Sequence, residues 1–159
     1  MKLTFLGTSA AWPSARHNNV CFVAHTHEPI LFECGPSILH QLAVAGIDPG
    51  TIRTVIVSHI HGDHSLGLPM LLTAAQIARR RHPLTVCLPA SAVEPLKRIC
   101  TTVYPGLGKI VSSLVEWLPL PEEALVACAA GVLESLFPQP RRNRLLAAHR
   151  QSNFFMLTR

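Results

Sequence analysis

Apolar and polar positions along the chain predict short strands that alternate with helices. Apolar runs of four to five residues bounded by turn residues indicate strands, and apolar residues at a spacing of three and four indicate helices. The predicted strands cover residues 3–6, 20–24, 30–34, 54–58 and 84–88, and the predicted helices cover residues 36–45, 65–81 and 91–103. The second and third strands form a predicted hairpin. This alternation predicts the α/β fold class.

The pattern weakens after residue 104. Residues 114–118, 125–129, 145–148 and 154–158 are predicted as strands, with a turn from Pro119 to Pro121. A chain of 159 residues can bury a hydrophobic core of its own. We therefore expect a single domain over residues 1–159.

Composition narrows the class of protein. With 48% hydrophobic and 14% charged residues, the chain is not a disordered polyampholyte. A net charge of +5 favours anionic partners such as nucleic acid, although two arginine runs, Arg79–Arg81 and Arg141–Arg144, fit a solvated helix end and a loop equally well. Five cysteines without a Cys-x-x-Cys pair indicate a reduced, cytoplasmic setting. No apolar stretch is long enough to span a membrane.

The most informative segment is Ser58-His59-Ile60-His61-Gly62-Asp63-His64, directly after a β-branched strand. Three imidazoles and a carboxylate within six residues carry many hydrogen-bonding groups. Near a core these groups are difficult to pair all together unless a metal ion organises them. Their nitrogen and oxygen atoms suit Zn²⁺, and Mn²⁺ or Fe²⁺ also accept these ligands. His59 and His61 should project to one side, and Gly62 allows a reversal that brings Asp63 and His64 to a neighbouring position. This arrangement predicts two adjacent metal ions; a solvated polar loop is the alternative.

These residues, followed by Gly67-Leu68-Pro69, resemble the His-x-His-x-Asp-His signature of the metallo-β-lactamase superfamily. Residues 5–9, Asn18-Asn19 and residues 31–35 are similar to the segments that precede the signature in that superfamily. The combination is most similar to the ribonuclease Z-like branch and covers the chain from residue 1 to about residue 89. Glu33 stands where that branch commonly has Asp, a difference that affects hydrogen bonding around the metal ligands.

The resemblance implies a metallo-β-lactamase-like αββα sandwich, of which the chain holds the N-terminal half to two thirds, so that the domain is C-terminally incomplete. It assigns His59 and His61 to one metal together with a later histidine, and His149 is similar to that residue. Asp63 and His64 are assigned to the second metal, and Asp63 also resembles the catalytic residue that orients and deprotonates the water. The family's bridging Asp and last His find no match in the chain.

The function implied is a metal-dependent hydrolase that cleaves a phosphodiester in RNA by a metal-activated water, as a tRNA 3′-processing endonuclease does. The expected cofactor is zinc, two ions in a complete site. Two alternatives stay open: a hydrolase of the same superfamily acting on a cyclic nucleotide, thioester or lactone, or a non-catalytic remnant that binds metal. The expected partner is RNA or another phosphodiester, with no membrane and with a homodimer left open. The remaining histidines match no ligand position; they are His17, His25, His27, His40 and His82.

Overall fold

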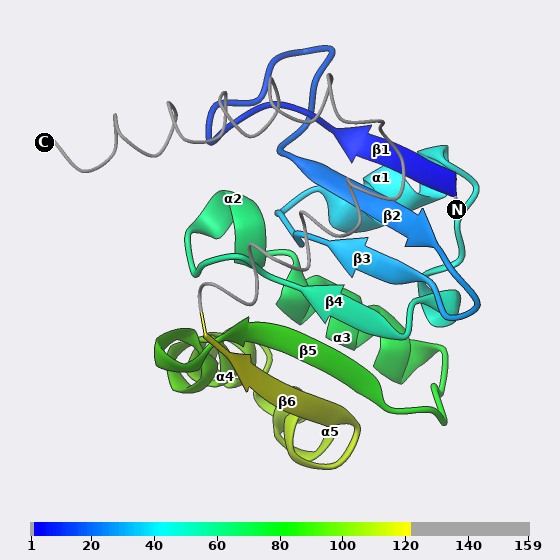
Figure 1. Ribbon diagram of the computed structural model, residues 1–159. Coiled ribbons are helices and arrows are strands. Elements are labelled where there is room, and N and C mark those ends of the chain that lie inside the picture. Colours follow the sequence, from blue (N-terminus) through cyan, green and yellow to red (C-terminus); the bar gives the residue numbers. More distant parts are fainter. Residues whose placement is uncertain (1, 122–159) are drawn as a thin grey trace, which may run out of the picture.

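Six strands form one mixed sheet whose order in space is the order of the sequence, β1 to β6 (Figure 1). The structure is a computed structural model that describes residues 2–121. The strands are β1 (Lys2–Gly7), β2 (Cys21–His25), β3 (Ile30–Phe32), β4 (Thr54–Ile56), β5 (Leu84–Pro89) and β6 (Val115–Leu120). The pairs β1–β2 and β2–β3 are antiparallel, and the pairs from β3 to β6 are parallel. Parallel neighbours need long crossovers, which is why the helices follow β3.

The helices pack on one face of the sheet (Figure 1). They are α1 (Ile38–Val44), α3 (Leu68–Ile77), α4 (Ala90–Val103) and α5 (Gly108–Ser113), with the 3₁₀ turns η1 (Pro49–Thr51) and η2 (Pro105–Leu107) between elements. The four-residue helix α2 (Gly62–Ser65) instead lies beyond the end of β4. None of the helices between residues 2 and 121 is long and apolar enough to cross a membrane.

The main core lies between this helical layer and the sheet. Strand residues that alternate toward the helices meet the apolar sides of α1, α3 and α4. The largest fully buried side chains are mostly leucines, and they include Leu31, Val55, Leu42, Leu72, Leu88 and Leu96. This core fixes the strands whose ends carry the polar motif.

The opposite face of the sheet carries a second, smaller apolar cluster. Phe22 and Phe32 stack there with ring centroids 4.5 Å apart, and Phe5 approaches Phe22 at 5.5 Å. Ile56 of β4 is buried in this cluster, while its neighbour Val55 belongs to the main core. Both faces of β4 are therefore apolar, which explains the unbroken run of β-branched residues in its sequence.

Most predicted elements are confirmed, with ends that differ by a few residues, including the β2–β3 hairpin. Two expectations were wrong, and one element was not predicted. The helix predicted for residues 65–81 is α3, which begins at Leu68 and ends at Ile77, while Ser65 is the last residue of α2. The turn predicted from Pro119 to Pro121 does not form there, since β6 continues through Pro119 to Leu120, and α5 was not predicted. The strands predicted for residues 125–129, 145–148 and 154–158 lie outside the described residues.

Candidate metal centre

The histidine motif occupies the carboxyl end of β4, where the chain turns into α2. His61 precedes the helix, and Asp63 and His64 lie inside it, so the reversal predicted at Gly62 is a short helical turn. The turn is fixed from within, because the buried Ser65 hydroxyl donates to the carbonyls of Ile60 and His61 at 2.8 and 3.0 Å. The Ser65 side chain thus holds the backbone of the motif in its turn.

Two backbone hydrogen bonds attach this turn to the segment that follows β3. The Cys34 amide donates to the His64 carbonyl at 2.7 Å, and the Gly67 amide donates to the Cys34 carbonyl at 2.8 Å. The approach is close enough to require glycine. A Cβ on Gly67 would lie 2.0 Å from the Gly35 carbonyl oxygen, and a Cβ on Gly35 would lie 2.4 Å from that of Asp63. The two glycines therefore set the distance between the motif and the sheet.

The three imidazoles of the motif lie in contact. His59 Nε2 is 3.0 Å from His61 Nδ1, and the His59 and His64 ring centroids are 4.1 Å apart. The Ser58 hydroxyl is 2.9 Å from His59 Nδ1 and fixes the orientation of that ring. The prediction that these histidines gather at one place is borne out by their contacts, while their role as ligands stays a prediction.

Two carboxylates flank His64. Glu33 Oε2 lies 3.2 Å from Nδ1, and Asp63 Oδ2 lies 3.2 Å from Nε2. Glu33 also accepts a hydrogen bond from the Ser58 amide at 3.2 Å. The Nδ1 contact is an ion pair when His64 is protonated, and it is not an aligned hydrogen bond, since the buried Nδ1 atom has no hydrogen-bond partner among the described residues. Glu33 reaches this position with a φ of 62°, in the left-handed region that few non-glycine residues occupy.

The surroundings shift the pKa values of two half-buried imidazoles, His59 and His64, in opposite directions. Burial, reinforced by the neighbouring His64 and His61, lowers the pKa of His59, so this ring favours the neutral form that can coordinate a metal. Burial also acts to lower the pKa of His64, but the Glu33 and Asp63 carboxylates outweigh it, and the net pKa of His64 is raised. A cation bound to His64 would therefore compete with a proton for the same ring.

The donor atoms suit a divalent cation, but the described residues do not complete a site. The 3.0 Å between His59 Nε2 and His61 Nδ1 is close to the roughly 3.3 Å between two ligands of a tetrahedral zinc ion. However, no group of three or more His, Cys, Asp or Glu side chains in residues 2–121 is arranged to hold a metal ion. His149, expected as a further ligand, lies outside the described residues.

The remaining histidines contribute nothing to this cluster. His25 bridges two strands, with Nε2 2.8 Å from the Thr4 hydroxyl, and the other four described histidines, His17, His27, His40 and His82, are exposed. The sequence reasoning missed Ser58 as the partner of the His59 ring. Its place directly before the first histidine was the only available signal.

The fold, the motif and the similarity to known proteins together define the class of this protein. The parallel strands, the His-x-His-x-Asp-His turn at the end of β4 and the similarity to ribonuclease BN and human tRNase Z define a member of the metallo-β-lactamase superfamily, in its ribonuclease Z-like branch. The chain belongs to the family described as anti-Pycsar protein Apyc1, which matches residues 1–104.

Named relatives agree with this placement. Ribonuclease BN of Salmonella typhimurium is 39% identical over 99 residues, which are 59% of this chain and 32% of that protein. The short form of human tRNase Z is 32% identical with a TM-score of 0.57, over 65% of this chain and 40% of that one. YhfI of Bacillus subtilis, a metallo-β-lactamase fold protein, is 18% identical with a TM-score of 0.57, over 75% of this chain and 44% of that one. The chain thus spans about a third of the length of its curated relatives.

Proposed function

We propose that this chain supplies His59, His61, Asp63 and His64 to a metal centre that hydrolyses a phosphodiester bond, with RNA as the substrate class. The observation that carries the proposal is the contact among the three imidazoles, with Asp63 at 3.2 Å from His64, at the carboxyl end of a parallel strand. Ligands of open α/β sheets bind at such strand ends. Zinc is the expected cation, two ions in a complete site, with His149 as a further ligand.

A bound divalent cation would supply a coordinated water of lowered pKa and stabilise negative charge on a phosphoryl oxygen. The side chains of the chain have separate tasks around it. His59 and His61 present neighbouring nitrogens, and Ser58 holds the His59 ring from the other side. Glu33 keeps His64 in place through its ion pair. Asp63 would supply the carboxylate that accepts a proton from an attacking water.

RNA is proposed because the relatives are named as nucleases of RNA. They are ribonuclease BN and human tRNase Z, and the net charge of +5 suits a polyanion. The cytoplasm is the proposed location, consistent with the buried thiols of Cys21, Cys34 and Cys100. Assembly as a homodimer stays a prediction.

The test measures metal content and hydrolysis in the same preparations. The 159-residue chain is loaded with zinc, its metal is counted by atomic emission, and turnover of bis(p-nitrophenyl) phosphate and of a tRNA precursor is measured. We expect His61→Ala and Asp63→Asn to lose both activities and to bind less zinc, because each removes one donor from the centre. His40→Ala is the matched control, since His40 is an exposed histidine of α1 away from the motif.

Three results would contradict the proposal. Zinc content that stays the same in His61→Ala would remove the ligand assignment. Hydrolysis that persists in both variants would place the reaction elsewhere. No turnover and less than one zinc ion per wild-type chain would favour a non-catalytic remnant, and turnover of a cyclic nucleotide, thioester or lactone without RNA cleavage would change the substrate class.

A further inference from the structure

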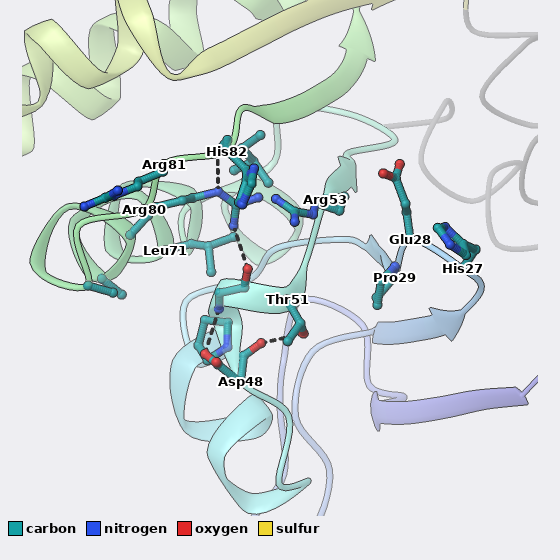
Figure 2. Close-up of a pocket in the computed structure, with 16 residues that line it drawn as sticks. His27, Glu28, Pro29, Asp48, Thr51, Arg53, Leu71, Arg80, Arg81 and His82 are labelled. Carbon is teal, nitrogen blue, oxygen red and sulfur yellow. Dashed lines mark hydrogen bonds between the residues drawn. The ribbon is translucent and has the colours of Figure 1, made fainter.

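A cavity of about 680 Å³, drawn in Figure 2, is lined by residues at the start of the parallel strands. The histidine motif lies at the opposite end of these strands. The cavity is bounded by the turn before β3, by η1, and by the segment that links α3 to β5. This volume is within the usual range for pockets that hold small organic ligands. The proposed phosphodiester chemistry makes no use of the cavity.

One side of the cavity is basic. Arg53, Arg80, Arg81 and His82 line it, and they include two members of the arginine run at residues 79–81. Figure 2 shows the Arg53 side chain extending toward Arg80. The sequence left this run open between a solvated helix end and a phosphate contact. In the structure the two residues differ: Arg80 is half-buried, whereas Arg81 is exposed.

Arg80 is a fixed part of the cavity lining. Its guanidinium donates to the carbonyls of Ile52 and Pro83 and, through Nε, to that of His82 at 2.9 Å. These bonds fix the group, but neutral carbonyls leave its positive charge uncompensated. Burial, with the nearby Arg53 as a second cause, lowers the pKa of Arg80. Two guanidinium groups thus face one small space at an electrostatic cost that an anion would remove.

Acidic residues near the cavity do not neutralise this pair. The Asp48 carboxylate caps the adjacent turn, where its Oδ1 accepts a hydrogen bond from the Gly50 amide at 2.8 Å. In the described part of the chain, the Glu28 carboxylate forms no ion pair with either arginine. Within residues 2–121, the Arg53 guanidinium has neither a hydrogen bond nor an ion pair. Arg53 is therefore a donor available to a ligand.

The other side of the cavity is apolar. Leu71, Ala74 and Ala75 of α3 and the following Ala78 present small aliphatic groups beside the arginines. Such a surface suits a flat organic ring more than solvent. A ligand that satisfies both sides needs a compact anionic group joined to an apolar or aromatic body.

We propose that this cavity is a second binding site, for a phosphorylated small molecule of the nucleoside monophosphate class. The phosphate is bound by the Arg53 guanidinium in the field of Arg80, and the base lies against Ala75 and its neighbours on α3. The site is independent of the metal centre, because it is at the other end of β4 and shares no residue with the histidine motif.

Isothermal titration of the full chain with adenosine monophosphate, in buffer containing a chelator, tests the proposal. We expect saturable binding that weakens at least about tenfold in Arg53→Gln, since a charge-assisted contact is removed. Arg98→Gln, which changes an exposed arginine of α4, is the matched control and should bind as the wild type does. Ala75→Leu fills the apolar side without changing charge and should weaken adenosine monophosphate binding while leaving that of inorganic phosphate unchanged.

The outcomes separate this site from the proposed function. Adenosine monophosphate binding that is retained in His61→Ala supports a second site, whatever that variant does to hydrolysis. Equal affinities for adenosine monophosphate and inorganic phosphate would overturn the role of the apolar side. Binding of a single-stranded RNA oligonucleotide without any binding of the mononucleotide, or an unchanged affinity in a folded Arg53→Gln variant, would overturn the proposal.

Discussion

Replacing Gly67 by alanine should detach the histidine motif from the sheet. The added Cβ would lie 2.0 Å from the Gly35 carbonyl oxygen, 2.8 Å from that of Cys34 and 2.7 Å from the Ile38 methyl group. Two of these neighbours are backbone atoms, which cannot rotate away as a side chain can. Moving α2 and the start of α3 outward is the only relief.

The cost can be worked from the contacts that this movement breaks. Forcing extra volume into a packed site costs about 1–3 kcal/mol. Separating the segments also breaks the Gly67–Cys34 and Cys34–His64 backbone hydrogen bonds, worth about 1 kcal/mol each. We therefore expect Gly67→Ala to lower the free energy of unfolding by about 3–5 kcal/mol, a large share of the 5–15 kcal/mol typical of a domain.

Urea unfolding followed by circular dichroism measures this change. Gly108→Ala is the matched control, because a Cβ there meets nothing within 4 Å and Gly108 opens α5. It should leave the protein as stable as before or raise its stability by up to about 1 kcal/mol. The reasoning is refuted if Gly67→Ala has the same transition midpoint and slope as the wild type, since the close approach would then have no energetic consequence.

Two further predictions follow from ionisable groups. Burial raises the pKa of Cys100 to about 11 and also raises the pKa values of Cys21 and Cys34. Treatment with iodoacetamide followed by peptide mapping should therefore label these three thiols only after unfolding. Labelling of Cys34 in the native protein would refute this prediction. The raised pKa of His64 means that its ion pair with Glu33 stabilises the metal-free fold below a pH of about 6.5 and that this contribution is lost as the pH rises through the folded pKa. Unfolding measured with a chelator should show this pH dependence in the wild type and a flatter one in Glu33→Gln, and an equal dependence in both would exclude the ion pair.

The sequence predicted best those elements whose hydrophobic pattern matches one packing arrangement. Residues 54–57 carry an unbroken β-branched run because Val55 and Ile56 are buried on opposite faces of the sheet. Failures occurred where packing overrides local preference. Helix α5 begins at Gly108, a weak helix former, yet Val111 is buried in the main core. Pro119 enters a strand because β6 is the last strand of the described sheet, where a missing amide is tolerated.

In the candidate site, too, local sequence spacing predicts some positions and tertiary structure decides the others. The spacing of His59, His61 and His64 indicates a shared location, since all three lie within one turn of the chain. The position of Glu33 could not be derived in this way, because it depends on a positive φ that a glutamate seldom adopts. Arg53 and Arg80 line the same cavity although they come from different segments of the sequence. No local sequence pattern predicts that two such residues lie near one another.

The sequential order of the sheet has a consequence for how the chain acquires its structure. Each described strand pairs with the one before it, so no strand in residues 2–121 has to wait for a distant segment to be synthesised. Closing short loops costs less entropy than closing long ones. The sheet can therefore grow one strand at a time from the amino terminus during translation, and the histidine turn is held against the β3–α1 connection as soon as residue 67 is available.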